Sequence, residues 1–259
     1  MEPVTPTRLR WGALAWLLTL QFFVVEAIAE SRYAGPYSRA DDTISALGTG
    51  ASAAHALMNA SFVAQGVLIL AGAVLLRPAL LRTAGQIAPV LLGVAAVGVV
   101  LVGVFPSDGN ALVHSIGAVA HLVGGGLGLI ALAYAVRPRS EALGTTLALL
   151  GLLGTAATVF FLTGVTEYLG EGGTERVAAY VIPVGLAVAA VALWRLAGPG
   201  SAERSAERAA ARQEQAERAR EREAALEASA RRAPQPAPTE TADADELDEH
   251  WAPVERRRD

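Results

Sequence analysis

The chain of 259 residues contains no cysteine and no lysine, so all 21 of its basic residues are arginines. Without cysteine it forms no disulfide, no thiolate metal site and no cysteine-linked lipid anchor. It also lacks a nucleotide-binding loop, a nucleophile elbow, a charge-lined pore pattern and a visible internal repeat, which weakens a transporter built from inverted halves. No nucleic-acid partner is expected. The preference for Ala, Gly, Val and Leu is typical of a GC-rich bacterial genome.

What the chain does have is six long apolar runs. Each is about 19–24 residues long, close to the ~20 residues with which an α-helix crosses a ~30 Å hydrocarbon core. The sequence therefore predicts an all-α membrane protein, in which residues 11–197 form a bundle of six transmembrane helices after a short N-terminal segment at 1–10. The runs are Trp11–Ala29, His55–Leu76, Gln86–Phe105, Val113–Val136, Ala142–Gly164 and Val177–Leu196.

The arginines near the ends of the runs predict the orientation. Short arginine-rich loops stay in the cytoplasm, and the other three connections carry more acidic than basic residues. We therefore expect a multi-pass protein of the cell membrane with both termini cytoplasmic. Alternatively, the first run and the small residues Ala27-Ile28-Ala29 fit a cleavable signal peptide, which would leave five crossings. The orienting arginines are Arg8, Arg10, Arg77, Arg82, Arg137, Arg139 and Arg195.

The C-terminal region is charged and separate from the bundle. Gly198-Pro199-Gly200 should end the sixth helix, and the remainder of 198–233 is rich in Ala, Glu and Arg, with the i,i+4 pair Glu214–Arg218 supporting an exposed helix. Leu226 is its one large apolar residue, so this coiled-coil-like composition has no coiled-coil seam. The segment is either a docking helix for a cytoplasmic protein partner or a solvated charged helix, and we favour the second. Residues 234–259 should be disordered.

The first outer connection is the longest and carries Tyr33, Tyr37 and Ser38 before the stretch Thr43-Ile44-Ser45-Ala46-Leu47-Gly48. We expect a short helix over Thr43–Leu47, capped by Asp41 or Asp42 and ended by Gly48. The connection either forms a small cap over the outer mouth of the bundle or is an ordered loop that seals it.

The second outer connection leads into two histidines. Asp108 can cap a turn before the fourth helix, and His114 should lie near the membrane surface. His121 lies seven residues, about 10 Å, deeper on nearly the same helix face, so it should face the bundle interior and find a partner. His55, at the outer start of the second helix, could approach the same region.

Together, His55, Asp108, His114 and His121 suggest a zinc site, because histidine and carboxylate are suitable zinc ligands. However, two histidines that bind one ion from a helix usually stand at i,i+4, and here the spacing is i,i+7. We therefore favour an interior hydrogen-bond network and predict no cofactor. Glu26, near the outer end of the first helix, is shallow enough to snorkel to the surface and is interpreted as structural, with a proton relay to His121 as the alternative.

At this point the chain resembles a known family. Pro36-Tyr37-Ser38 running into Thr43-Ile44-Ser45-Ala46-Leu47-Gly48, and Phe105-Pro106-Ser107-Asp108 followed by His114, are similar to a prokaryotic family of six-helix membrane proteins known as domain of unknown function 998. The similarity covers roughly residues 10–197, and Ala46 stands where the family usually has an acidic residue. The resemblance implies a fold and a topology but no activity.

Three functions remain open at this stage. The favoured one is a non-enzymatic membrane protein that binds a membrane lipid or a partner at an outward-facing polar site beneath the first outer connection. The alternative is a lipid hydrolase or transferase that uses Asp108, His114 and His121, with Ser45 as a further catalytic candidate and zinc as a candidate metal. The third is small-solute transport past Glu26 and His121. The expected outer polar site comprises Glu26, Tyr33, Tyr37, Ser38, Thr43, Ser45, His55, Asp108, His114 and His121.

Overall fold

A computed structural model describes residues 5–197 and 201–232, and within these residues every regular element is a helix. Six segments are long and apolar enough to cross a membrane, which confirms the predicted fold class. The first span consists of two helices in series, and a 3-10 turn η2 (Arg77–Ala79) follows the second span. The helices are α1 (Pro6–Leu18) and α2 (Gln21–Ser31), α3 (His55–Leu76), α4 (Ala84–Val104), α5 (Ala111–Val136), α6 (Glu141–Thr163) and α7 (Glu171–Ala197).

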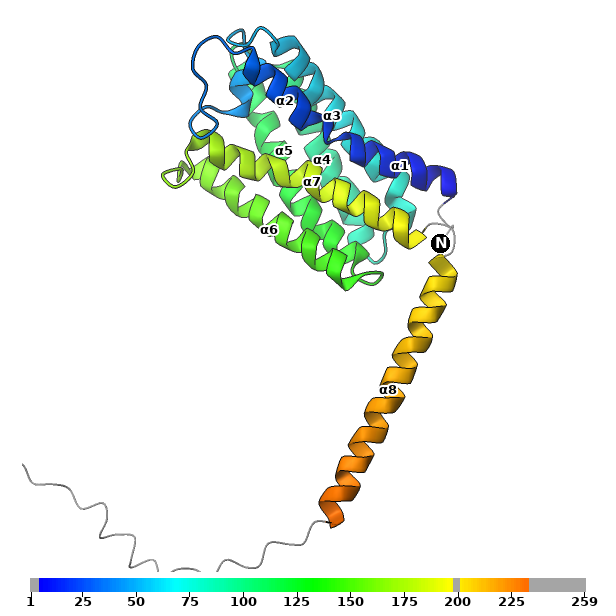
Figure 1. Cartoon of the computed structure of the whole chain (residues 1–259). Helices are drawn as coiled ribbons and strands as arrows, with labels where there is room; N and C mark the ends of the chain where they lie inside the picture. The colour runs from blue at the N-terminus through cyan, green and yellow to red at the C-terminus, as the bar shows by residue number, and fades with distance from the viewer. Residues whose placement is uncertain (1–4, 198–200, 233–259) are drawn as a thin grey trace, which may run out of the picture. The chain divides into compact units, whose positions relative to one another are not determined.

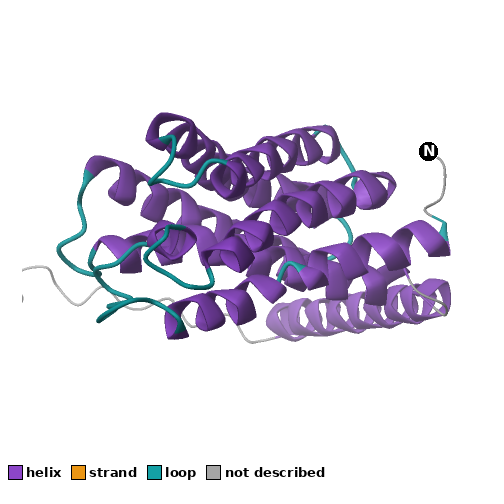
Figure 2. Ribbon diagram, turned by 90° about the horizontal axis from the view of Figure 1, so that it is seen from above, coloured by secondary structure: helices purple, strands orange, loops and turns teal. Residues whose placement is uncertain are grey.

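The helices of the six spans run side by side (Figures 1 and 2), and their contacts close into a ring. Each span packs against the next along the chain, and α1 closes the ring by contacting both α3 and α7, while α5 also contacts α7. We call the end of the bundle that carries the 32–54 loop and the connections at 105–110 and 164–170 the loop end. The opposite end, with the start of α1 and the connections at 77–83 and 137–140, is the arginine end.

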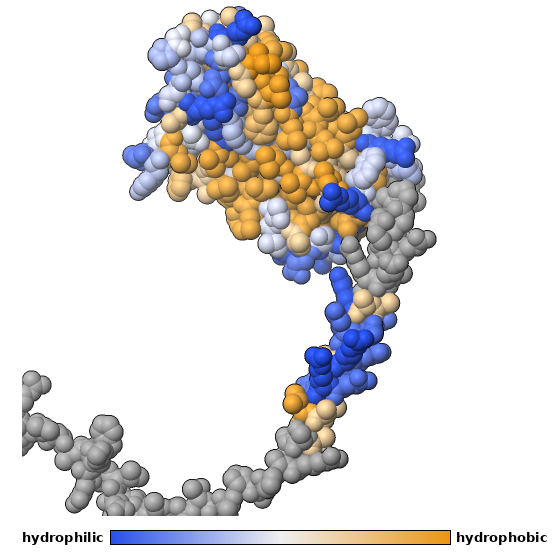
Figure 3. All heavy atoms as spheres, viewed as in Figure 1, coloured by the Kyte–Doolittle hydropathy of each residue, from blue (hydrophilic) through white to orange (hydrophobic). Residues whose placement is uncertain are grey.

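The outer surface of the bundle is apolar. Many large hydrophobic side chains are exposed, among them Leu112 at 72%, Val90 at 65% and Leu149 at 63%. On the face shown in Figure 3, hydrophobic residues form a broad band along the helices, and hydrophilic residues gather toward the two ends. This distribution suits a bilayer, whose hydrocarbon takes the place of water around the middle of the bundle.

Glycines allow the closest helix pairs to meet. A Cβ on Gly98 of α4 would lie 2.5 Å from the carbonyl oxygen of Gly117, and a Cβ on Gly117 of α5 would lie 2.7 Å from that of Gly98. The two backbones therefore touch where neither residue has a side chain, as is common for helix pairs in membranes. Further along the same pair, a Cβ on Gly124 would lie 2.8 Å from the Ala95 nitrogen.

The first span differs from the single uninterrupted helix that the apolar run predicts. The Thr19 hydroxyl donates to the Trp16 carbonyl at 2.5 Å, and the backbone switches to i,i+3 hydrogen bonds at Thr19 and Leu20 before α2 begins. A threonine hydroxyl that bonds back to its own helix bends the helix, and a 3-10 turn tightens it. The break separates α1, whose Trp16 is fully buried and donates to the Ile69 carbonyl of α3, from α2, which carries Glu26.

The chain divides into two units between Ser201 and Ala202. The described residues that follow the bundle form the helix α8 (Ser201–Arg232), in which Arg218 and Glu214 form the expected i,i+4 ion pair at 2.5 Å. The predicted break at 198–200 and the predicted disorder of 234–259 concern residues outside the described part of the chain.

Replacing Gly98 by Ala should lower the free energy of unfolding by about 1–3 kcal/mol, because the added methyl group meets the α5 backbone and forces the helices apart. The matched control is Gly93→Ala on the same helix, where a Cβ has no neighbour within 4 Å. That control should be neutral or slightly stabilising, since alanine favours a helix over glycine. Thermal unfolding of both variants in detergent micelles provides the comparison, and equal effects would contradict the close α4–α5 contact.

Candidate functional site at the loop end

The 32–54 loop is ordered and closed on itself. Tyr33 and Ser52 form an isolated antiparallel bridge, and the Ala34 N–H donates to the Ala51 carbonyl at 2.8 Å. Between these ends, the 3-10 helix η1 (Ile44–Gly48) contacts α2, α3 and α7, with the side chains of Ile44 and Leu47 buried. The short helix thus lies where the sequence indicates and ends at Gly48.

The expected caps, however, are wrong. The N-cap of η1 is Thr43, whose hydroxyl accepts from the Ala46 N–H at 3.3 Å. Asp42 instead accepts from the Ser38 N–H at 2.8 Å, and Asp41 accepts from the Ser38 hydroxyl at 2.7 Å, so both carboxylates stabilise the preceding turn. Aspartates readily bond to nearby backbone in this way, and the turn competes with the cap for them.

Arg176, near the start of α7, holds the loop to the bundle. Its guanidinium forms a buried ion pair with Glu26 of α2, at 3.0 Å between Nε and Oε1. Its Nη1 donates to the carbonyls of Arg39 and Asp42, at 2.8 and 2.7 Å, and its Nη2 donates to the Tyr37 hydroxyl. One side chain therefore joins two transmembrane helices and both sides of the loop turn. The interpretation of Glu26 as a snorkelling residue is wrong, because its side chain is only 2% exposed.

Tyr37 completes this anchor. Its hydroxyl donates to the Thr43 carbonyl at 3.0 Å while accepting from Arg176, and its ring packs 4.9 Å from that of Tyr33. Burial raises the pKa of the Tyr37 phenol to about 12, so the hydroxyl keeps the proton that it donates. At the edge of the loop, the Arg39–Glu30 ion pair at 2.5 Å is more exposed, and its hydrogen bond raises the pKa of Arg39.

Glu175 lies beside Arg176 and forms a second polar chain. Its carboxylate accepts from the Ile44 N–H at 2.5 Å and lies 3.2 Å from the Ser45 hydroxyl, which in turn is 2.9 Å from His114 Nε2. His114 Nδ1 lies 2.9 Å from the Phe105 carbonyl, which only accepts, so Nδ1 carries a proton. The single Ser45 proton can serve either Glu175 or His114. The Ser45 hydroxyl therefore lies between two side chains and donates to one of them at a time.

Asp108 and His55 have other partners. Asp108 accepts from the Gly50 N–H at 3.0 Å and ties the 105–110 connection to the loop, whereas the cap of α5 is Asn110, so the expected capping role of Asp108 is wrong. His55 Nδ1 lies 2.8 Å from the Ser52 carbonyl at the start of α3. In residues 5–197 and 201–232, no three His, Asp or Glu side chains come together in a way that could hold a metal ion.

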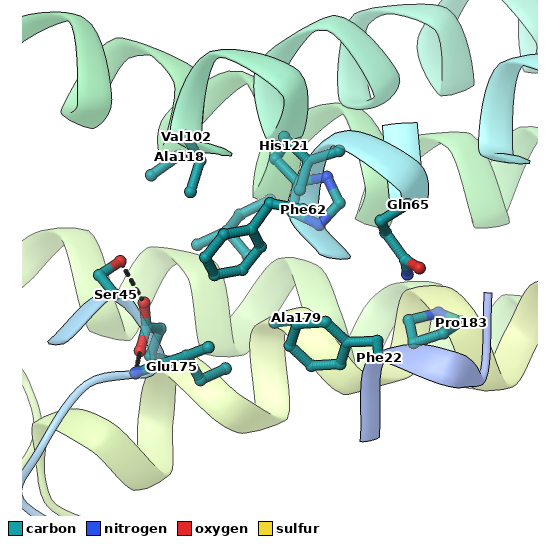
Figure 4. A pocket seen from close by; sticks show the side chains of 13 residues that line it. Phe22, Ser45, Phe62, Gln65, Val102, Ala118, His121, Glu175, Ala179 and Pro183 are labelled. Carbon is teal, nitrogen blue, oxygen red and sulfur yellow. Dashed lines mark hydrogen bonds between the residues drawn. The ribbon is translucent and has the colours of Figure 1, made fainter. Parts of the chain in front are cut away.

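A cavity of about 40 Å³ lies beneath η1 (Figure 4). Ser45 and Glu175 lie at one end of it, and His121 and Gln65 lie toward the other, with the Phe62 ring between them. Gln65 and His121 each stand ten residues into their helices, about 15 Å from the loop end at 1.5 Å per residue. The cavity therefore reaches from the loop to the middle of the bundle.

Three acceptors lie at the deep end of the cavity, beside the N–H donors of the Gln65 amide. The Gln65 side chain is 2% exposed, and its Oε1 has no hydrogen-bond partner. His121 Nδ1 lies 3.0 Å from the Ala95 carbonyl and must donate to it, which leaves Nε2 of a neutral ring as an acceptor. Pro183 has no N–H, so the carbonyl of Ala179, which also lines the cavity, lacks its usual helical donor.

Arg176 and Glu175 were not identified as site residues from the sequence. Both were used only as charges of a connecting loop, to predict the orientation in the membrane. Two signals were available. A carboxylate such as Glu26 inside an apolar span needs a cation, and Arg176 stands next to the last apolar run at the same end. Tyr180, four residues further along, shares the face of Arg176 and donates to Glu26 at 2.6 Å.

Fold and site define a class of polytopic membrane protein, a ring of six spans with a polar core at one end beneath an ordered loop. The family model described as "Protein of unknown function (DUF998)" matches residues 16–194. The chain belongs to this family, as the motifs around Ser45 and His114 suggest. No curated protein and no solved structure matches the chain.

Replacing Arg176 by Gln leaves the Glu26 carboxylate buried without its cation, so the free energy of unfolding should fall by roughly 3–5 kcal/mol. The double variant Glu26→Gln/Arg176→Gln removes both charges and should recover part of this loss. Arg39→Gln, which breaks the exposed pair with Glu30, is the control and should cost about 0–1 kcal/mol. Denaturant unfolding in micelles measures all three, and a double variant no more stable than Arg176→Gln would argue against the buried charge as the cause.

Proposed function

We propose that this protein binds a hydroxyl-bearing membrane lipid, whose polar end enters the cavity beneath η1. The observation that carries the proposal is the Gln65 amide oxygen, buried at the cavity and without a partner. A buried acceptor left unpaired costs about 1–3 kcal/mol, and a ligand that supplies a donor there removes this cost. The arginines at the opposite end support an orientation in which the loop end faces away from the cytoplasm.

The chemistry of the lining favours a neutral hydroxyl over a charged group. At the depth of Gln65 and His121, a charge would need a fully paired counter-ion, and the charges of Glu26 and Arg176 already pair with each other. A hydroxyl carries no charge, and it can donate to the unpaired Gln65 Oε1 while it accepts from an amide N–H. Apolar residues such as Phe22, Phe62 and Val102 form most of the remaining wall.

The cavity volume limits what can enter. About 40 Å³ accommodates a few water-sized groups, which suits the hydroxyl end of a lipid and not its chains. The chains would lie in the surrounding bilayer, which the apolar outer surface of the helices contacts. The small volume favours a lipid over a water-soluble ligand, because a water-soluble ligand would have to fit entirely within the cavity or the loop.

The hydrolase alternative has one observation in its favour, the 2.9 Å contact between the Ser45 hydroxyl and His114 Nε2. Such a pair could activate a serine nucleophile. Against it, the N–H groups on either side of Ser45 have partners: that of Ile44 donates to Glu175, and that of Ala46 donates to Thr43. They are not available as an oxyanion hole, and the Glu175 carboxylate next to Ser45 opposes a developing oxyanion.

The lipid proposal predicts the outcome of photolabelling in vesicles. A monoacylglycerol with a diazirine in its chain should label peptides of α3 and α5 at the cavity, and its methylated analogue, which cannot donate a hydrogen bond, should label them about three- to tenfold less, the range expected for one hydrogen bond. Gln65→Leu should lower labelling by the free probe to a similar extent. Mass spectrometry of the labelled peptides is the measurement.

Two controls belong to that experiment. Gln86→Leu makes the same chemical change at an exposed site of the arginine end and should leave the labelling unchanged. Ala118→Leu fills the cavity without changing charge and should reduce labelling. Equal labelling by both probes, or labelling unaffected by Gln65→Leu and Ala118→Leu, would overturn the proposal.

The same proposal predicts that Ser45 is not a nucleophile. A fluorophosphonate probe applied to the protein in vesicles should not modify Ser45, because the donors that would stabilise the tetrahedral adduct are occupied. A purified serine hydrolase in the same vesicles serves as the positive control. Labelling that disappears in Ser45→Ala and in His114→Gln would establish the hydrolase alternative instead.

A further inference from the structure

A groove of about 800 Å³ lies at the arginine end, between the start of α1, the end of α3 and the start of α4. Three guanidinium groups line it, those of Arg8, Arg77 and Arg82, together with apolar residues such as Leu80. It is at the opposite end of the bundle from the cavity beneath η1. It is therefore a separate site, independent of the proposed hydroxyl-lipid function.

Within residues 5–197 and 201–232, no carboxylate neutralises the positive charges of this groove. No acidic residue of this described part lines the groove, and its ion pairs involve other arginines. Arg8 donates at 3.5 Å to the Val74 carbonyl, a neutral acceptor. Three cations around one groove therefore attract an anion, and a phosphate suits guanidinium groups because they bind it through paired N–H donors.

Arg82 adds an observation from the backbone. Its φ is +62°, and among the described residues it is the one non-glycine residue with a positive φ. A residue with a side chain pays about 1–2 kcal/mol to adopt this conformation, which glycine adopts freely. Because this backbone conformation is costly for a residue with a side chain, an arginine here suggests that its side chain has a functional role.

The outer walls of the groove are apolar and face the bilayer. Val74 of α3 is 52% exposed and Val90 of α4 is 65% exposed, and both line the groove. The groove thus combines cations at the end of the bundle with a hydrocarbon-compatible surface along the helices. A molecule that fits both parts carries a phosphate and acyl chains.

We propose that this groove binds an anionic phospholipid, with its phosphate among Arg8, Arg77 and Arg82 and its acyl chains along Val74 and Val90. Basic pockets between transmembrane helices are suited to such headgroups. Free phosphate would use the cations alone and leave the apolar walls uncovered. The acidic segment 234–259 of the same chain would also leave those walls uncovered.

The test uses the full chain, exchanged from vesicles that contain equal amounts of phosphatidylglycerol and phosphatidylcholine, and native mass spectrometry counts the lipids that remain bound. The wild-type chain should retain phosphatidylglycerol selectively, even in excess inorganic phosphate. The variant Arg77→Gln/Arg82→Asn should retain it roughly 25-fold less, because each arginine contributes about fivefold. Asparagine is chosen at position 82 because it tolerates a positive φ.

The matched control is Arg10→Gln/Arg137→Gln, which removes the same charge at the same end but outside the groove, and it should keep the selectivity. Thermal unfolding of each variant, and the single change Arg8→Gln with an expected fivefold effect, guard against a folding defect. Equal losses in both double variants would show general charge attraction and overturn the site. Displacement by inorganic phosphate, or a several-fold gain of lipid when the acidic residues of 234–259 are neutralised, would overturn the lipid as occupant.

Discussion

The loop end of this protein depends on one buried cation. Arg176 is 6% exposed, and a guanidinium removed from water is tolerated only if its donors are satisfied and its charge is balanced. Glu26 balances the charge, while loop carbonyls and the Tyr37 hydroxyl take most of the remaining donors. The planar guanidinium, with five N–H groups, can bridge α2, α7 and the loop at once, which a lysine could not. The loop is thereby held where η1 covers the cavity.

Two consecutive residues of α7 bond to different parts of the loop at this end. Neighbouring helix positions point about 100° apart, so Glu175 and Arg176 reach different parts of the loop. Arg176 holds the turn at residues 37–42, and Glu175 bonds the backbone of Ile44 and the hydroxyl of Ser45. The wall of the cavity is therefore positioned by a polar chain that runs from α7 through η1 to His114 on α5. A disturbance of the anchor would reach the cavity through this chain.

The sequence predicts the parts of the structure that arise from periodic or local patterns. The six spans follow from run length, and the bounds of α3 agree with the apolar run. The short helix η1 follows from an apolar pair that ends at glycine, although its N-cap is Thr43 and not the expected Asp41 or Asp42. The break at Thr19 could not be foreseen, because a threonine in an apolar run more often keeps the helix intact. The sequence suggests that Glu26 needs a cation at its end of the bundle, but it does not identify Arg176 as the partner, because the ion pair joins residues 150 positions apart. Long-range pairs leave no periodic signal in one sequence.

The two ends of the bundle differ in how their charges are paired within the fold, and this difference determines which ligands each end can bind. At the loop end the buried charges of Glu26 and Arg176 are paired with each other, and the Glu175 carboxylate accepts from the Ile44 N–H. The acceptor that stays unpaired at the cavity is Gln65 Oε1, which a neutral donor can satisfy. At the arginine end three arginines line a groove to which the described residues contribute no carboxylate, so an anion would balance its charge. Whether the charged side chains of an end are paired with each other therefore determines whether its ligand is neutral or charged. A neutral amphiphile suits the first site, and the second requires a charged one.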